Sequence, residues 1–371
     1  MRIGVDIRNL THEISGTSRY IYEILRELLK KKKNKIYLFS PSPIKVTYKK
    51  NLKTKNLYES FFYLPLLRYI WGKYYLKRKL EKFNIDIFWG AAHRIPADLP
   101  KNIIKIVTIF DTVFLDSPHL MSKFNYLKEY LTTPQSILTA DYILVPSEST
   151  KKSLIKHFGS NLKNKIKVIY LGGNLSTNKI SKQEYHESNY LKPYLLFVGS
   201  ISPRKNLKNF LWSFSLMNKN LQNRYNIIIV GNFNFEQIDI ISFTKKIGLE
   251  NTVRFKGSIN DSELKLFYQN AEYLIFPSLN EGFGLPIIEA QSFGIPVITS
   301  NIYSMPEIMG RGGYLLNPYS VNSMKKKLTK VLLNKNNKNI KKMYALKNSK
   351  KYNWKTTSNE ILRLFEGLYY K

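Results

Sequence analysis

Short apolar runs and longer stretches of helical character alternate along most of the chain. The apolar runs predict buried strands, and in chain order they are residues 2–7, 36–39, 85–89, 103–109, 141–145, 167–170, 194–198, 227–230, 253–255 and 273–276. Strands that alternate with helices are what a parallel sheet requires, so the predicted fold class is α/β. Residues 45–56 depart from this pattern, and we expect a solvated loop or an edge strand there.

The hydrophobic pattern is interrupted near the middle of the chain. Residues 172–189 are polar, rich in Ser and Asn and without periodicity, which indicates a connection between domains. Two domains are also the natural expectation for 371 residues. We therefore expect one domain over residues 1–175 and a second over residues 190–352, with a helix near residues 355–371 at the end of the chain.

The strand at residues 273–276 leads into a glycine-containing loop and then a helix. Glycines such as Gly284 allow main-chain N–H groups to turn toward a ligand. Pro286 suits the first position of a helix, and Gly294 suits the position just past its end. Because a helix N-terminus presents unpaired N–H groups and a partial positive charge, this stretch predicts an anion site.

Two carboxylates, Glu281 and Glu289, bracket the predicted anion site. Beside a phosphate they would repel it, so we expect them to hold hydroxyl groups. Arg204 and Lys205 follow the strand-ending Gly199 in the same domain. A guanidinium can bond two phosphate oxygens as a fork and an ammonium adds a point charge, so this pair suits a diphosphate. A phosphate flanked by hydroxyl acceptors describes a nucleotide sugar.

The stretch FPSLNEGFGLPIIEAQSFGIPVITSN, residues 276–301, resembles the donor site of family 4 glycosyltransferases of the GT-B fold, including the seven-residue spacing between its two glutamates. Pro203-Arg204-Lys205-Asn206 resembles a second block of the same family. The resemblance implies two Rossmann-like domains whose parallel sheets face each other across a cleft. It further implies that residues 1–175 bind the acceptor, that residues 190–352 bind the donor, and that the terminal helix packs back on the first domain.

The resemblance also assigns residues to the donor. Gly16-Thr17-Ser18-Arg19-Tyr20 is similar to the family's Gly-x-Gly-Arg-Tyr, with Ser18 in place of the second glycine, so only Gly16 is expected to approach the donor phosphates. The backbone from Phe255 to Ser258 is expected to contact the base. The complete predicted donor set is Gly16, Gly199, Arg204, Lys205, Phe255, Glu281, Phe283, Gly284, Leu285 and Glu289.

The predicted chemistry is transfer of a sugar to a hydroxyl group with retained anomeric configuration, as the family implies. The catalytic set is Glu281, Arg204, Lys205 and Asp111, and neither a metal nor a cofactor is expected. Asp111 is a candidate for orienting the acceptor, with a helix-capping role as the alternative. Many relatives have His-Asp where this chain has Phe110-Asp111, so no histidine role is carried over to that position. We expect His93 to lie near a strand end.

Charge and composition bear on the partners. The chain has no cysteine and a formal net charge of +33. Residues 26–82 hold 17 Lys and Arg against 3 Asp and Glu, interleaved with aromatic residues such as Phe61, Tyr63, Tyr69 and Tyr74. Basic residues beside aromatic ones fit an anionic membrane surface, and an ordinary helix with a buried aromatic face is the alternative. No motif for nucleic-acid binding accompanies the charge.

Three functional readings stay open. The first is a transferase of hexose, with mannose from GDP-mannose as the expected donor, to a glycan or polyprenyl-linked acceptor in bacterial surface polysaccharide synthesis. The second is the same fold using a UDP-sugar and a soluble acceptor, and the third is a catalytically idle subunit that binds membrane or a partner. We expect a cytoplasmic protein, peripheral on the inner face of the cytoplasmic membrane in the first reading. The intact cluster of Arg204, Lys205, Glu281 and Glu289 favours an active enzyme.

Overall fold

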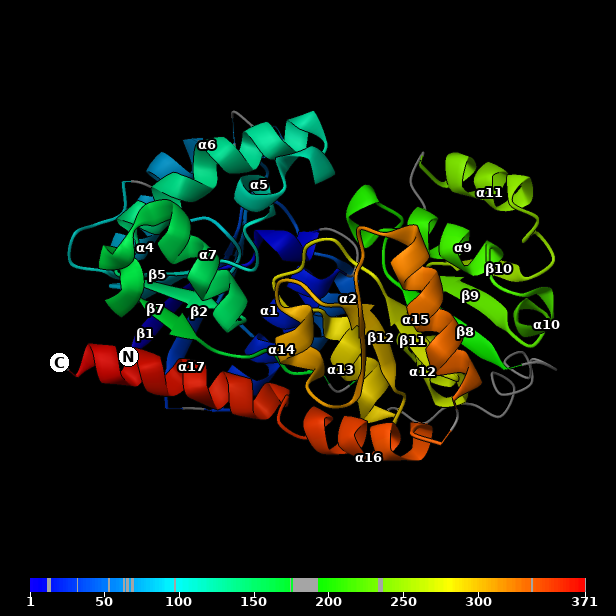
Figure 1. Cartoon of the computed structure of the whole chain (residues 1–371). Coiled ribbons are helices and arrows are strands. Elements are labelled where there is room, and N and C mark those ends of the chain that lie inside the picture. The colour runs from blue at the N-terminus through cyan, green and yellow to red at the C-terminus, as the bar shows by residue number, and fades with distance from the viewer. Residues whose placement is uncertain are drawn as a thin grey trace. The chain divides into compact units, whose positions relative to one another are not determined.

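The computed structural model describes residues 1–11, 15–31, 33–52, 54–62, 64, 67, 70–96, 98–173, 175, 193–232, 236–334 and 336–370. The chain forms two compact units (Figure 1). The N-terminal unit comprises Met1–Gly172 and Asn353–Lys371, and the C-terminal unit comprises Gly173–Tyr352. Most of the polar connection predicted at residues 172–189 lies outside the described residues.

The N-terminal unit is built on a seven-stranded parallel sheet in the order β3-β2-β1-β4-β5-β6-β7. Its strands are β1 (Arg2–Asp6), β2 (Lys35–Ser40), β3 (Leu57–Glu59), β4 (Ile87–Gly90), β5 (Ile104–Thr108), β6 (Tyr142–Val145) and β7 (Ile166–Val168). The central strands are apolar and buried because helices cover both faces of a parallel sheet. Except for the edge strand β3, these strands lie where the apolar runs predicted them.

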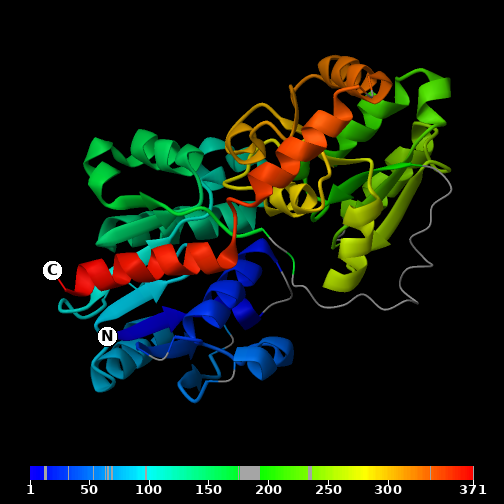
Figure 2. The ribbon, with the colours of Figure 1, turned by 90° about the horizontal axis from the view of Figure 1, so that it is seen from below.

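Helices fill the connections of this unit: α1 (Gly16–Leu28), α2 (Val46–Leu52), α4 (Lys77–Lys82), α5 (Val113–Asp116), α6 (Lys123–Thr139), α7 (Glu148–Phe158) and α17 (Trp354–Tyr369), with short 3₁₀ turns η1 (Arg8–Thr11), η3 (Pro118–Leu120) and η4 (Ser160–Asn164) and a π-helix, η2 (Trp71–Leu76). The terminal helix α17 runs beside α1 (Figure 2). The ring centres of Phe365 and Trp89 lie 5.9 Å apart, and those of Trp354 and Tyr20 lie 6.4 Å apart. The end of the chain therefore completes the hydrophobic core of the N-terminal unit.

The expectation of a loop or edge strand at residues 45–56 is wrong, because helix α2 occupies Val46–Leu52. Tyr48 and Leu52 are both buried, and their spacing of four residues places them on one face of a helix. The many lysines of this stretch concealed that two-residue apolar face. Strand β3 follows the helix at the edge of the sheet.

The C-terminal unit is built on a six-stranded sheet in the order β10-β9-β8-β11-β12-β13, again parallel throughout. Its strands are β8 (Tyr194–Val198), β9 (Asn226–Val230), β10 (Val253–Gly257), β11 (Tyr273–Phe276), β12 (Val297–Ser300) and β13 (Gly313–Leu316). Its helices are η5 (Pro203–Lys205), α9 (Leu207–Ser215), α10 (Lys219–Gln222), α11 (Glu236–Lys246), α12 (Asp261–Asn270), α13 (Leu285–Ser292), α14 (Met305–Met309), α15 (Val321–Leu333) and α16 (Lys338–Ser349).

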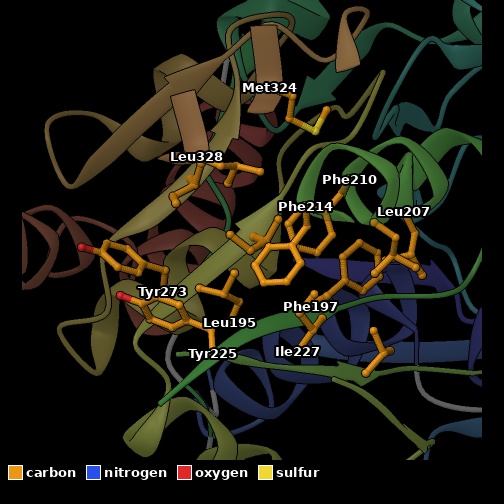
Figure 3. Close-up of a cluster of buried hydrophobic side chains, with 14 of the residues drawn as sticks. Leu195, Phe197, Leu207, Phe210, Phe214, Tyr225, Ile227, Tyr273, Met324 and Leu328 are labelled. Atoms are coloured by element: carbon orange, nitrogen blue, oxygen red, sulfur yellow. The ribbon is translucent and has the colours of Figure 1, made fainter. Parts of the chain in front are cut away.

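A large apolar cluster fixes the sheet of the C-terminal unit against α9 and α15 (Figure 3). Phe210 and Phe214 of α9 pack over Phe197 of β8, and Met324 and Leu328 of α15 close the cluster. All five side chains are buried. This core holds the ends of β8 and β11 rigidly, and the predicted site residues follow those two strands.

Strand order reverses once in each sheet. In the N-terminal unit the reversal lies between β1 and β4, and in the C-terminal unit it lies between β8 and β11. At such a reversal the two neighbouring strands send their connections in opposite directions, which opens a crevice outside their carboxyl ends. Ligands of open α/β sheets bind in that crevice, so each unit has one expected binding position.

Within the described part of the chain, the longest apolar helical segments fall short of what crossing a bilayer requires.

Candidate functional site

The loop after β11 and the start of α13 form one wall of the site. Gly284 precedes the helix with a φ of +103°, a backbone conformation that suits glycine, and no side chain caps the helix N-terminus. Leu285 takes the first helical position and Pro286 the second, one position later than predicted. Proline is tolerated there because the second N–H of a helix also lacks an internal partner. Gly294 lies just past the helix end, as predicted, with a φ of +73°.

Two cations and one carboxylate meet at the strand reversal of this unit. Arg204 and Lys205 lie on η5, which follows β8, and Glu281 lies in the loop after β11. Arg204 Nη1 donates to Glu281 Oε2 at 2.9 Å, and Lys205 Nζ donates to Glu281 Oε1 at 2.6 Å. Each carboxylate oxygen is therefore paired with a different cation. The sequence predicted these three residues for one site but did not predict this direct pairing.

The environment of the triad fixes its charges. Glu281 and Lys205 are each only 8% exposed. Burial raises the pKa of Glu281, but the charges of Arg204 and Lys205 outweigh burial and leave the pKa below its usual value. Lys205 also lies over the ring of Phe276, with Nζ 4.7 Å from the ring centre. The Glu281 carboxylate thus faces two cationic side chains, one of which also lies over an aromatic face.

The backbone of the two loops is held by residues that sequence reasoning did not single out for this role. Asn206 adopts a left-handed conformation, and its Nδ2 donates to the carbonyls of Pro277 and Pro318. Ser304 Oγ donates to the carbonyls of Glu281 at 2.7 Å and Phe283 at 3.0 Å. These bonds join segments about 20 to 110 residues apart in the chain, so no local pattern could have indicated them.

The second predicted carboxylate, Glu289, lies one turn into α13 and is buried. Its Oε2 accepts a hydrogen bond from the hydroxyl of Tyr268 at 2.9 Å. Tyr268 belongs to α12 and stacks on Phe293 at 5.8 Å, so its hydroxyl is held in place. Tyr268 thus helps to orient Glu289, whereas Arg204 and Lys205 orient Glu281.

Three glycines meet at the carboxyl ends of β8, β9 and β10. A methyl group added to Gly231 would lie 1.9 Å from the carbonyl oxygen of Gly199, and the N–H of Gly231 donates to the carbonyl of Gly257. Gly199 was predicted, and Gly257 lies within the stretch from Phe255 to Ser258 whose backbone was expected to contact the base. Gly231 was not predicted, although it follows a predicted strand as Gly199 does. The ladder between β9 and β10 also shifts register between Phe255 and Gly257.

The predicted apolar members of the donor set point into the protein. Phe283 and Leu285 are buried, and the ring of Phe283 packs edge-on against Tyr352 at 5.7 Å. Phe255 packs against the core of the unit. Any contact that these residues make to a ligand would therefore run through their backbone.

In the N-terminal unit, Gly16 is the first residue of α1, and Ser15 caps that helix. Ser15 and Ser18 form a capping box, in which each side chain bonds the other's backbone N–H. Ser18 is fully buried and also accepts a hydrogen bond from Tyr48 at 3.2 Å. The serine that stands where relatives have glycine thus directs its side chain into the protein.

Asp111 follows β5, and its Oδ1 accepts the backbone N–H of Val113 at 3.3 Å at the start of α5. The N-cap position of α5 is taken by Thr112, so Asp111 makes this local bond from the residue before the cap. Phe110 stacks on His93 with ring centres 5.8 Å apart, and the N–H of Phe110 donates to His93 Nε2 at 3.1 Å. The Nε2 lone pair of His93 is therefore occupied by the backbone at the very position where relatives carry a histidine.

Two family models together cover most of the chain. Residues 14–177 match the model described as Glycosyltransferase Family 4. Residues 178–351 match the model described as Glycosyl transferases group 1. The border between the two matches falls close to the division between the two compact units.

The chain is similar to known proteins over at least two thirds of its length. O-antigen chain mannosyltransferase B of Escherichia coli is 23% identical, with 99% of this chain and 100% of the relative covered. O-antigen chain mannosyltransferase RfbU of Salmonella typhimurium is 28% identical over 68% of this chain and 67% of its own. The crystal structure of Anabaena HepE with UDP and glucose has a TM-score of 0.76 at 18% identity, covering 99% of this chain and 100% of HepE. The structural likeness extends over both units.

Proposed function

Because this chain belongs to the family 4 glycosyltransferases, with the GT-B fold, we propose that it transfers a hexose from a nucleotide sugar to a hydroxyl of a glycan or lipid-linked acceptor. The proposed reaction retains the anomeric configuration and needs no metal. The proposed setting is bacterial surface polysaccharide synthesis, in line with the O-antigen mannosyltransferases among its relatives.

The observation that carries this proposal is the triad of Arg204, Lys205 and Glu281 at the reversal between β8 and β11. The nucleoside diphosphate is the leaving group of the reaction, and negative charge grows on it as the sugar departs. Groups already aimed at developing charge give the largest share of rate enhancement in many enzymes. Two fixed cations and the uncapped N-terminus of α13 supply such groups.

Glu281 has two roles in this proposal. In the structure its carboxylate neutralises one of the two positive charges that the diphosphate requires. A bound diphosphate would compete for both cations and release the carboxylate. The released Glu281 would then be free to accept hydroxyl groups of the transferred sugar. Donor binding and sugar recognition are coupled through one ionic exchange.

The remaining proposed donor contacts lie in the same unit. Glu289, held by Tyr268, is the proposed acceptor of the ribose hydroxyls. The backbone at Phe255 and Gly257, where the strand ladder is irregular, is the proposed contact for the base. No carboxylate is assigned as a covalent nucleophile, so the two-carboxylate logic of glycosidases does not apply here.

Mannose from GDP-mannose is the proposed donor, supported by the two mannosyltransferase relatives. UDP-sugars are the alternative, since the structurally similar HepE binds UDP and glucose. Thermal shift measurements on the purified chain would decide between them, because a ligand stabilises the fold in proportion to its affinity and concentration. A larger rise in Tm with GDP than with UDP, together with transfer of mannose from GDP-mannose, would support the proposal. Stabilisation by UDP alone would contradict the mannose assignment.

The proposed location is the inner face of the cytoplasmic membrane, through the basic segment 26–82. In the structure some apolar side chains of this segment are buried and others are exposed. Trp71 and Leu76 are buried, whereas Phe61 is 73% and Tyr74 54% exposed. Ile70 is 39% exposed and lies one turn before Tyr74 on the same face. Tyr63, Leu66 and Tyr69 lie outside the described residues.

A further inference from the structure

A second group of charged side chains lies at the strand reversal of the N-terminal unit. Arg8 follows β1 directly, and Arg94 follows β4 in the connection to β5. The two strands are neighbours, and their register pairs Asp6 with Gly90, so both connections leave the sheet at the same level. This position corresponds, in the other unit, to the place of Arg204 and Glu281. The reversal is the expected ligand position of an open α/β sheet.

The guanidinium of Arg8 is fixed by the strand end beside it. Its Nε donates to Asp6 Oδ2 at 2.8 Å, its Nη2 contacts the same oxygen, and its backbone N–H donates to Asp6 Oδ1 at 3.0 Å. The group also lies over the ring of Trp71 at 5.4 Å. Asp6 is buried, whereas the Arg8 side chain is 22% exposed. Arg8 is therefore held from within the protein and open to solvent at its outer edge.

The guanidinium of Arg94 is fixed by helix α6. Its Nη2 donates to Glu129 Oε1 at 3.1 Å, and Glu129 Oε2 accepts from Thr133 at 2.6 Å. His93 Nδ1 lies 3.4 Å from the same Glu129 oxygen. Burial raises the pKa of Glu129, but its bonds to His93 and Thr133 and the charge of Arg94 lower it well below the usual range. Glu129 is thus a permanent anchor for Arg94.

Both guanidiniums have N–H groups that bond no described residue. Among the residues that the structure describes, Nη1 of Arg8 and both Nε and Nη1 of Arg94 have no hydrogen-bond partner. The two groups are also close enough to repel each other. Burial lowers the pKa of Arg94, Glu129 raises it, and the charge of Arg8 lowers it again. Two fixed, partly buried guanidiniums with unused donors suit an oxyanion, whose oxygens can accept several charge-assisted hydrogen bonds.

We propose that Arg8 and Arg94 bind an oxyanion carried by the acceptor, either a phosphate ester or a sugar carboxylate, and so position the acceptor for transfer. The proposal rests on the transferase function for the identity of the ligand as an acceptor. It predicts that the acceptor carries a negative charge, a property that the donor-binding residues do not determine. The counter-charges on Asp6 and Glu129 orient the two guanidiniums without covering their free donors.

The test is calorimetry of three synthetic mannosides on the full chain: one with a diphosphate-linked alkyl group, one with a carboxylate and one with a neutral alkyl ether. A nucleoside diphosphate in excess keeps Arg204 and Lys205 occupied. We expect the diphosphate or the carboxylate compound to bind at least about tenfold more tightly than the neutral one, and Arg94→Gln and Arg8→Gln to remove that preference. Arg94→Lys should restore part of it. The control is Arg363→Gln, which removes one exposed positive charge from α17 of the same unit.

The two charged compounds distinguish the source of the oxyanion. Equal binding of all three mannosides by the wild type would overturn the proposal. An equal loss of affinity for the charged and the neutral compounds in Arg94→Gln would overturn it too. A preference for the charged compound that survives in both variants would also overturn it. Transfer of mannose is measured separately. If the charged compound binds through Arg94 but receives no sugar from any donor, the proposed reaction fails and the oxyanion site stands.

Discussion

The Nζ atom of Lys205 lies 2.6 Å from Oε1 of Glu281, and both side chains are buried. The residues predicted to bind the diphosphate are thus paired with the residue predicted to bind the sugar. In the proposed mechanism, a bound donor would replace this buried ion pair with contacts of its own. A substitution at either residue changes the charge that its partner faces, and the predictions below depend on that coupling.

Arg204→Ala and Lys205→Ala should each lower turnover about a hundredfold. A charge-assisted bond to the leaving diphosphate strengthens as charge develops, and its loss costs roughly 2–4 kcal/mol of barrier. Steady-state transfer assays with a saturating donor measure the effect. Lys208→Ala is the matched control, since Lys208 is an exposed lysine of the same unit that pairs with Asp239. Wild-type turnover in either test variant would show that the diphosphate assignment is wrong.

Glu281→Gln and Glu289→Gln should separate the two halves of the donor. Glu289→Gln should weaken a nucleoside diphosphate about ten- to hundredfold, because a buried carboxylate that accepts hydroxyl bonds contributes roughly 1.5–3 kcal/mol. Glu281→Gln should depress turnover but leave the nucleoside diphosphate bound at least as tightly as in the wild type, since it frees both cations. Calorimetry with the diphosphate on both variants decides the matter.

Tyr268→Phe serves as the control for Glu289, because it removes the hydroxyl that orients the carboxylate and leaves the ring in place. Its effect on nucleoside diphosphate binding should be smaller than that of Glu289→Gln and of the same sign. Equal weakening in Glu281→Gln and Glu289→Gln would contradict the division of roles.

The stability difference between the wild type and Glu281→Gln should depend on pH. The pKa of Glu281 is lower in the folded protein than its ordinary value of 4.5. Its stabilising contribution is therefore complete above pH 4.5 and is lost as pH falls through the lower folded pKa. Breaking a buried pair costs about 3 kcal/mol, so urea unfolding at pH 7 should show a difference of that order that narrows below pH 4.5. A difference that stays constant down to pH 3 would count against the pairing.

A chelator should leave transfer activity nearly intact. In the proposed mechanism Arg204, Lys205 and the start of α13 supply the positive charge that the leaving diphosphate requires. Activity is compared before and after treatment with excess EDTA, followed by addition of manganese or magnesium. Complete loss on chelation that either metal restores would overturn the metal-free mechanism.

Vesicles with anionic lipid should bind the chain, and the binding should weaken as salt concentration rises. The basic side chains of residues 26–82 supply the charge, and exposed Phe61, Ile70 and Tyr74 supply apolar contact. Flotation with anionic and with neutral vesicles measures it. Phe61→Ser combined with Tyr74→Ser should reduce flotation without changing Tm, because both side chains are more than half exposed. Equal flotation on neutral vesicles would exclude the electrostatic contribution.

Local pattern was sufficient for much of this protein. The apolar runs located most of the strands, because a strand buried on both faces must be apolar wherever it lies in the sheet. The Pro286 and Gly294 signals located helix α13, since helix ends have local backbone requirements. Dependence on local pattern also explains the wrong prediction at residues 45–56. There a helix with only two buried side chains carries too short an apolar pattern to be distinguished from a solvated loop.

Tertiary structure alone decided which charges meet. Glu281 could have faced solvent or a ligand, but the sheet brings the ends of β8 and β11 together and places it between Arg204 and Lys205, 77 and 76 residues away. Arg8 and Arg94 were absent from the predicted site for the same reason. Their partners, Asp6 and Glu129, and their shared position depend on β1 pairing with β4 and on α6 packing over the sheet. The residues of a segment determine which ligand groups that segment can bind. Strand order determines which segments lie together, and it could not be predicted here because pairing between distant strands leaves no local periodicity in the sequence.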